Sequence, residues 1–167
     1  ALLPDATVDS VIETAFKHAV PMVKNQLKRD LAIAAKHDDP LDMIDELHQH
    51  YQANDAAYDP SRAHETCCKA FAIFAASKGD ARKCIIAGSN FGRDTDCLAA
   101  SVAGLAGALQ GIEGVPSEWV DTVDGATVNH PYSNSTSTIK ETADGMYEAL
   151  QNEVSKKRRY VAMFDGE

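Results

Sequence analysis

Two aspartates separated by a single residue are the feature of this sequence with the clearest chemical potential. Asp94 and Asp96 lie in the segment NFGRDTDC, residues 90–97, directly before a helical pattern at 98–111. With Asp94 as the N-cap, Asp96 and Cys97 fall in the first turn, so three side chains gather at one open helix end. Paired carboxylates on a fixed backbone suit a hard cation such as Mg²⁺ or Ca²⁺. The alternative is a capping aspartate beside one that complements the helix dipole.

Helices must position these side chains, because apolar residues recur at helical spacing along most of the chain. The spacing predicts helices within residues 8–19, 23–35, 41–51, 67–74, 80–85, 98–111 and 139–154. Asp39 and Asp80 are expected N-caps, and Thr138 with Glu141 forms a capping box. Residues 53–61 are expected to form a polar loop, and one short strand is expected near residues 119–128. The sequence therefore predicts an all-α fold.

The helix at 98–111 is unusually rich in small residues, including Gly104 and Gly107. A glycine inside a helix costs about 1 kcal/mol relative to alanine. Close helix–helix approach on more than one side would offset that cost. We therefore expect a buried central helix, in which leucine at position 104 would overpack its surroundings.

The segment at 90–97, the small-residue helix and VPSEW at 115–119 together resemble the C-terminal signature of the ADP-ribosylglycohydrolase family, which includes the lens J-crystallins. PDATVDSV at 4–11 and STIKETADGMY at 137–147 resemble the helices that flank this signature, so the resemblance covers nearly the whole chain. It implies an all-α, orthogonal multi-helical fold, of which residues 1–167 look like the C-terminal half of one domain.

The resemblance also implies a metal centre. In this family an Asp-x-Asp-Thr quartet supplies ligands to two magnesium ions, which makes Asp94 and Asp96 the implied catalytic residues and metal ligands. Cys97 stands at the third ligand position, where the family more usually has threonine. A thiol is a poor partner for Mg²⁺, which prefers oxygen, so the second magnesium position is in doubt.

Three further residues are candidates for substrate contact under the same resemblance. Arg93 stands where many relatives have a second glycine; it would either reach a phosphate of ADP-ribose bidentately or form a salt bridge that holds the aspartates. Asn90 and Gly92 complete the candidate set.

The implied function is magnesium-dependent hydrolysis of the glycosidic bond at the distal ribose of ADP-ribosyl groups. The alternative is a non-catalytic structural or ligand-binding relative, as the lens crystallins are. The family's other half-site is a Ser/Thr-Asp-Asp-Thr motif preceded by a glycine-rich segment, and neither occurs in this sequence. The expected partners are therefore that N-terminal half and an ADP-ribosylated substrate or an ADP-ribose-like small molecule.

Composition argues against several other classes. The formal net charge of −9 disfavours nucleic acid as a partner, since such binders need basic surface. No apolar run approaches the ~20 residues that a membrane span needs. The four cysteines show no spacing typical of zinc knuckles and the six histidines form no cluster in the sequence. This cysteine usage fits reduced thiols, so we expect a cytoplasmic protein.

Overall fold

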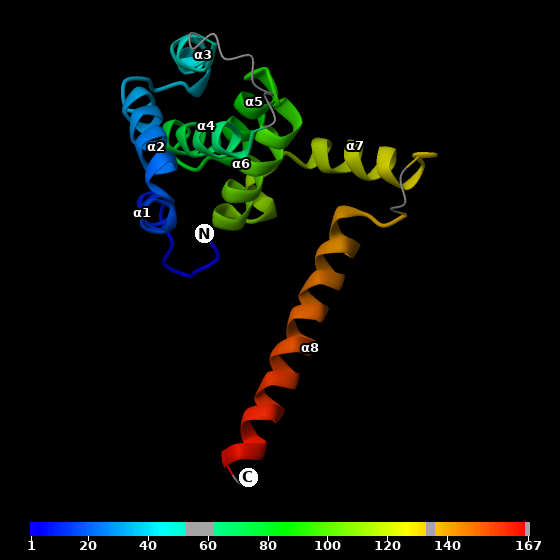
Figure 1. Ribbon diagram of the computed structural model, residues 1–167. Coiled ribbons are helices and arrows are strands. Elements are labelled where there is room, and N and C mark those ends of the chain that lie inside the picture. The colour runs from blue at the N-terminus through cyan, green and yellow to red at the C-terminus, as the bar shows by residue number, and fades with distance from the viewer. Residues whose placement is uncertain (53–61, 133–135, 166–167) are drawn as a thin grey trace. The chain divides into compact units, whose positions relative to one another are not determined.

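The computed structural model describes residues 1–52, 62–132 and 136–165, and within these ranges every regular element is helical (Figure 1). The elements are α1 (Val8–His18), α2 (Pro21–Ala34), η1 (Pro40–Met43), α3 (Ile44–Gln52), α4 (Ala63–Ala76), α5 (Ala81–Asn90), α6 (Thr95–Gln110), η2 (Ile112–Gly114), α7 (Ser117–Val128) and α8 (Ile139–Asp165). The all-α prediction is confirmed. The loop expected at 53–61 lies outside the described residues.

Capping side chains begin three of these elements where the sequence predicts. Asp80 accepts a hydrogen bond from the Lys83 amide at 2.8 Å, and Asp39 starts η1 by accepting from Leu41 at 2.9 Å. At α8 the Thr138 amide donates to the Glu141 carboxylate at 2.7 Å, while the Glu141 amide donates to the Thr138 hydroxyl at 3.2 Å. This reciprocal pair is the predicted capping box.

The strand expected near residues 119–128 is wrong, because these residues form α7. The β-branched residues there include Val120, Val123 and Thr127, which recur every three or four residues and so match a helix rather than an alternating strand. The amides of Trp119 and Val120 both donate to the Pro116 carbonyl, which starts the first turn. Local helical spacing therefore prevails over β propensity here.

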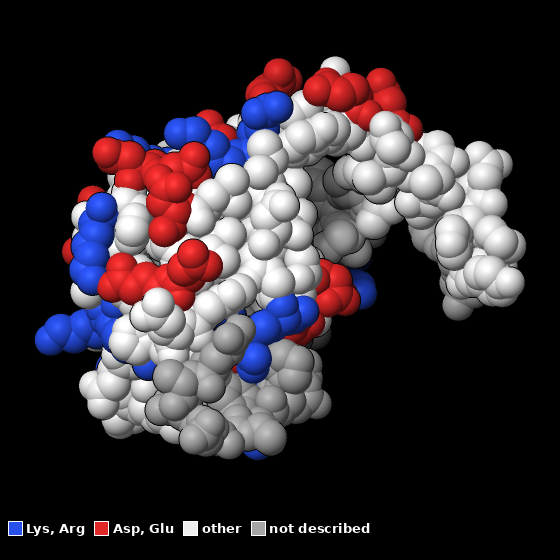
Figure 2. Space-filling view, turned by 90° about the horizontal axis from the view of Figure 1, so that it is seen from above, with Lys and Arg blue, Asp and Glu red and all other residues white. Residues whose placement is uncertain are grey.

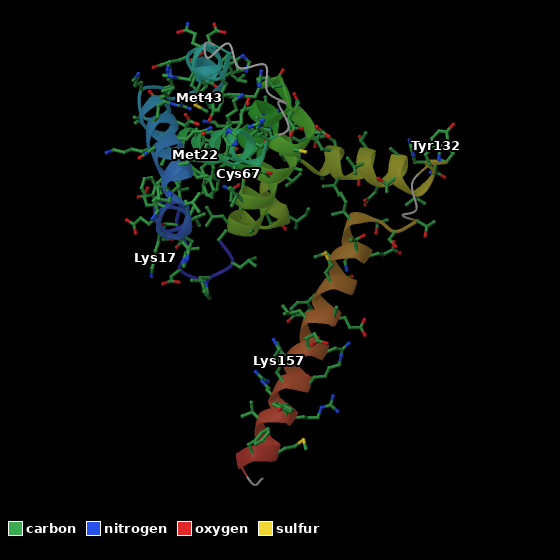
Figure 3. The ribbon with its side chains drawn as sticks, viewed as in Figure 1. Lys17, Met22, Met43, Cys67, Tyr132 and Lys157 are labelled. Atoms are coloured by element: carbon green, nitrogen blue, oxygen red, sulfur yellow. The ribbon has the colours of Figure 1, made fainter. Side chains whose placement is uncertain are left out.

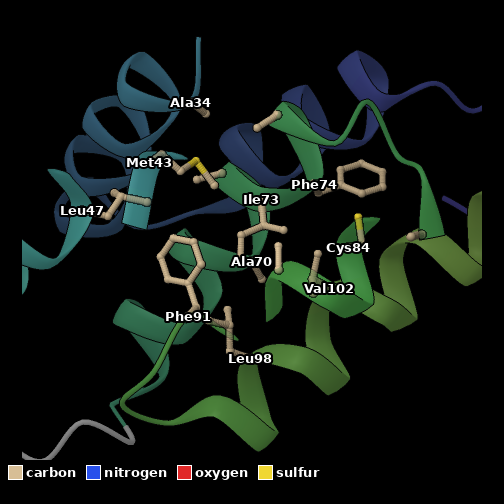
Figure 4. Close-up of a cluster of buried hydrophobic side chains, with 14 of the residues drawn as sticks. Ala34, Met43, Leu47, Ala70, Ile73, Phe74, Cys84, Phe91, Leu98 and Val102 are labelled. Atoms are coloured by element: carbon tan, nitrogen blue, oxygen red, sulfur yellow. The ribbon is translucent and has the colours of Figure 1, made fainter. Parts of the chain in front are cut away.

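The chain divides into two compact units, Ala1–Val115 and Pro116–Glu167. The single domain expected for residues 1–167 stays a prediction. The hydrophobic core belongs to the first unit, where α4 packs against α2 and α6, and α5 packs against α6 (Figure 4). The central side chains of this core include Ile73, Phe74, Cys84, Phe91, Leu98 and Val102. Phe91 and Leu98 flank the segment that carries the aspartates, so the core anchors that segment at both ends.

Helices α5 and α6 approach each other closely at Gly88. A Cβ built on Gly88 would lie 2.8 Å from the Cα atom of Ala99 and 2.9 Å from a methyl carbon of Val102. The first of these neighbours is backbone, which has little freedom to move aside. The absence of a side chain at Gly88 is what lets the two helices meet at this distance.

The predicted role of Gly104 and Gly107 is wrong. Within the described part of the chain, a Cβ built on either glycine would meet no atom within 4 Å, and Gly104 is exposed. Helix α6 buries only one face, through Leu98, Val102 and Ala106. Thus α6 packs through one face and presents its small-residue face outward.

The second unit contains α7 and α8, which are joined at the start of α8 by a hydrogen bond from the Ile139 amide to Asp124 at 2.7 Å. A pocket of about 340 Å³ between these helices is lined by Asp124, Thr127, Ser137, Ile139, Thr142, Ala143 and Met146. Side chains project from α8 all around its axis, as near the labelled Lys157 (Figure 3). Among the residues described, no helix has the length and apolar character needed to cross a membrane.

Two glycine substitutions test this account of α6. Gly104→Ala should raise the free energy of unfolding by up to about 1 kcal/mol, because the new methyl meets nothing and alanine favours the helix. Gly88→Ala should lower it by about 1–3 kcal/mol, since its methyl would overlap the α6 backbone. Urea unfolding followed by circular dichroism measures both changes. Equal effects of the two substitutions would contradict the one-sided packing of α6.

Candidate metal centre

The chain reverses between α5 and α6 through a short turn with unusual backbone angles. Phe91 is fully buried and fixes the start of this turn. Gly92 and Arg93 follow with φ values of +74° and +61°, both left-handed. Glycine adopts this conformation freely, whereas a residue with a Cβ such as arginine adopts it at a cost. Asp94 then occupies the N-cap of α6.

Asp94, Asp96 and Cys97 converge as the sequence predicts. One ligand atom from each of them lies within 4.8 Å of the others. Asp94 is half-buried, while Asp96 and Cys97 are exposed. Three potential ligand atoms thus meet at an open helix end, although their role as metal ligands stays a prediction.

Neither carboxylate is used for helix capping. The Asp94 side chain makes no capping hydrogen bond and instead accepts a long one, 3.4 Å, from the Thr66 hydroxyl of α4. Of the residues that the structure describes, none forms a hydrogen bond or ion pair with the Asp96 carboxylate. A simple N-cap therefore does not account for Asp94, and oxygen atoms of both residues stay available to a cation.

Cys97 fits a magnesium site less well than the aspartates do. A hydrogen bond with the Asp94 carboxylate, together with the negative charge of that group, raises the pKa of the Cys97 thiol. The thiol is thereby held in its neutral form beside the carboxylates. Two carboxylates suit Mg²⁺, whereas a sulfur donor does not. The residues present fit a magnesium ion through Asp94 and Asp96 alone.

Arg93 pairs with a residue that the sequence analysis did not single out. Its guanidinium contacts both carboxylate oxygens of Glu65 on α4, at 2.6 and 3.1 Å. The salt bridge expected between Arg93 and the aspartates is therefore replaced by this bidentate pair. The proposed contact of Arg93 with a substrate phosphate stays a prediction.

Glu65 is almost completely buried and interacts with a second cation. Lys69, one helical turn further along α4, donates to the Glu65 carboxylate at 2.6 Å and is itself only 2% exposed. Burial lowers the pKa of Lys69, while the hydrogen bond and charge of Glu65 act in the opposite direction. The ammonium also lies 4.5 Å from the ring centroid of Tyr51, a favourable cation–π distance.

A narrow recess lies beneath Asp94, lined by Glu65, Thr66, Lys69, Gly92, Asp94 and Leu98. These side chains fill it so closely that it has no room for a water molecule. The recess therefore cannot admit a ligand, whereas Asp96 and Cys97 are exposed to solvent. Asn90 is exposed at the end of α5, but its side-chain amide donates to the Ile86 carbonyl at 2.8 Å, within its own helix.

His48 also reaches this turn, although its sequence position gave no sign of it. Its Nε2 atom lies 2.6 Å from the Phe91 carbonyl oxygen, and its ring is close to Gly92. Burial lowers the pKa of His48, aided by the charge of Lys69. Among His48, Glu65 and Lys69, which surround the turn, only the last two gave a signal in the sequence. Their spacing of four residues is typical of a helical ion pair.

Charged side chains of both signs occur on the surface and beside the turn. Across the face shown in Figure 2, acidic and basic side chains are interspersed, and neither sign covers the surface alone. Next to the turn, Glu65 forms salt bridges with two cations, Lys69 and Arg93.

A family model for ADP-ribosylglycohydrolase matches residues 1–156 of the chain. This chain belongs to the ADP-ribosylglycohydrolase family. No curated protein and no solved structure matches the sequence. Membership confirms the resemblance seen in the sequence and agrees with the all-α fold. It makes the family's glycohydrolase chemistry the first function to consider for the turn at 91–97.

The Asp94 carboxylate beside Cys97 gives this family member a measurable property. Asp94→Asn should make the Cys97 thiol react faster with a disulfide reagent at neutral pH, because losing the carboxylate charge lowers the thiol pKa. Asp96→Asn should change the rate less, since Asp96 contributes least to the shift. A Cys67→Ser background removes the other exposed thiol.

In the same experiment Cys68 and Cys84 should stay unreactive. Both are buried, and burial raises their pKa values to about 12 and about 11. Labelling rates followed by absorbance give the comparison. A slower reaction at Cys97 in Asp94→Asn would contradict the contact.

Proposed function

We propose that this chain contributes metal ligands to a magnesium-dependent hydrolase that cleaves the glycosidic bond at the distal ribose of ADP-ribosyl groups. The observation that carries the proposal is the convergence of Asp94 and Asp96 at the exposed start of α6 in a member of this family. A bound magnesium would supply Lewis-acid polarisation and orientation of the ribose hydroxyls.

The two aspartates would play different parts. Asp94 is half-buried and receives a hydrogen bond from Thr66, so its carboxylate has a defined orientation and suits a ligand role. Asp96 is exposed beside it and can hold a water molecule and accept its proton. Arg93, Asn90 and Gly92 border the same turn and are the proposed substrate contacts.

The second candidate function is that of a non-catalytic structural or ligand-binding relative. One specific observation favours it, namely the thiol of Cys97 at the third ligand position, which is a poor donor to magnesium. The two functions differ in a direct test, because only the enzyme requires both aspartates for turnover in the presence of Mg²⁺.

Aspartate substitutions test the proposed metal role. Asp94→Asn and Asp96→Asn should each weaken Mg²⁺ affinity at least about tenfold, since a neutral amide replaces a charged oxygen ligand. Asp9→Asn is the matched control, an exposed aspartate in the first turn of α1. Isothermal titration with Mg²⁺ measures the affinities. Equal binding by all three variants would sink the proposal and favour the non-catalytic alternative.

Cys97→Thr tests the departure from the family pattern. A threonine hydroxyl is an oxygen donor of suitable hardness, so this variant should bind Mg²⁺ several-fold more tightly than the natural sequence. Cys67→Thr is the control, because Cys67 is likewise exposed but stands on α4 outside the cluster. If both variants keep the original Mg²⁺ affinity, position 97 lies outside the metal shell.

Turnover should require more protein than these residues provide. Magnesium takes six oxygen ligands, and Asp94 with Asp96 supply only a minority of them. We propose that the Ser/Thr-Asp-Asp-Thr motif and glycine-rich segment of the family complete the site. ADP-ribose release from an ADP-ribosylated protein should be near background for residues 1–167 and should rise on addition of an N-terminal half. Rapid magnesium-dependent release by the short chain alone would refute this requirement.

A further inference from the structure

We propose that Glu65 is a positioning residue for the Asp94 carboxylate, acting through the backbone of Arg93; the inference rests on the proposed metal function. The starting observation is the left-handed conformation of Arg93, with φ of +61°. This conformation is unfavourable for a residue with a Cβ and persists only where surrounding contacts impose it. Because Asp94 follows immediately, the angles at Arg93 set the direction in which the Asp94 side chain leaves the turn.

The bidentate pair between Arg93 and Glu65 is a contact that can impose this conformation. Both carboxylate oxygens of Glu65 are engaged, at 2.6 and 3.1 Å, so the guanidinium is fixed in orientation as well as in distance. The Arg93 side chain is only 21% exposed, and that of Glu65 only 2%. Little solvent is present to screen the pair, and it restrains the turn more strongly than a surface ion pair would.

Glu65 itself is held in place from the other side. Lys69 donates to it at 2.6 Å, and the Lys69 ammonium lies over the rings of Tyr51 and Phe91, at 4.5 and 5.8 Å from their centroids. Helix α4, which carries Glu65, Thr66 and Lys69, packs against both α2 and α6. The carboxylate is therefore attached to the most enclosed helix of the unit, with a second cation fixing its orientation.

Two adjacent residues of α4, Glu65 and Thr66, thus act on the backbone and the side chain of Asp94. Glu65 fixes the backbone before Asp94, and the Thr66 hydroxyl donates to the Asp94 carboxylate at 3.4 Å. No capping hydrogen bond holds that carboxylate, and apart from its interaction with Cys97 at the start of α6, the contacts that orient Asp94 come from α4. Without Glu65, Arg93 would relax toward right-handed angles and Asp94 would turn away from Asp96.

Three substitutions separate positioning from simple stabilisation. Glu65→Gln removes the charge that holds Arg93. Arg93→Gln breaks the same pair but leaves Glu65 bound to Lys69, so it avoids an unpaired buried charge. Arg93→Gly also breaks the pair, yet glycine adopts left-handed angles without strain. Glu46→Gln is the control, since Glu46 forms an ion pair with Lys36 and contacts the His37 ring away from the turn.

Two measurements on the 167-residue chain are compared. The first is Mn²⁺ affinity by electron paramagnetic resonance, with Mn²⁺ standing in for Mg²⁺. The second is hydrogen exchange of the Leu98 amide, which donates to the Asp94 carbonyl at 3.1 Å. Glu65→Gln and Arg93→Gln should weaken Mn²⁺ binding about tenfold and speed exchange at Leu98 by a similar factor. Arg93→Gly should weaken Mn²⁺ binding and speed exchange at Leu98 clearly less than Arg93→Gln does. Glu46→Gln should change neither quantity.

Equal losses of Mn²⁺ affinity and of exchange protection at Leu98 in Arg93→Gly and Arg93→Gln would overturn the inference. They would show that the charge of Arg93 matters and its backbone conformation does not. Unchanged exchange in Arg93→Gln would overturn it as well. If Glu65→Gln fails to fold, the two Arg93 variants still decide the question. If the unmodified chain binds no Mn²⁺ or Mg²⁺, the proposed metal function fails, whereas the order of exchange rates among the variants still decides the role of Glu65.

Discussion

The contact between Gly88 and the backbone of Ala99 sets the geometry on which the candidate centre depends. It brings α5 and α6 together at a distance that no other residue type would allow. The connection between these helices must then reverse direction over Phe91 to Asp94 alone. Two consecutive residues with left-handed backbone accomplish this reversal, and buried Phe91 anchors it in the core. The aspartates therefore stand at a strained, well-anchored turn, which is where preorganised ligands are expected.

Much of this arrangement could be read from the sequence, because it depends on local rules. Helical spacing, together with the caps at Asp39, Asp80 and Thr138, predicted the helices, and the Asp-x-Asp spacing before a helix predicted converging carboxylates. These features need only neighbours within four residues, which the sequence displays directly. The strand expected near 119–128 is wrong because the β-branched residues there also recur at helical spacing, and this spacing prevails over β propensity.

The surroundings of the aspartates could not be read in this way. Glu65 contacts Arg93, which is 28 positions away in the sequence, and His48 contacts Phe91, which is 43 positions away. Only the packing of α3 and α4 against the turn brings them there. The packing of the glycines in α6 could not be read from the sequence either. The small-residue composition of α6 suggested close packing, but Gly88 of α5 makes the close contact, while a Cβ on Gly104 would meet no atom of the described residues within 4 Å.

The small-residue face of α6 and the chemistry at its start are linked. Helix α6 buries one side against α4 and α5, so its first turn keeps Asp96 and Cys97 exposed rather than enclosed. Carboxylates that remain hydrated bind a cation weakly, because water competes for both the ion and the ligand. A second surface placed over the start of α6 would exclude that water and strengthen every electrostatic contact there. The Glu65–Arg93 pair orients Asp94 before any such surface binds. Binding of that surface would therefore need to order only Asp96 and Cys97.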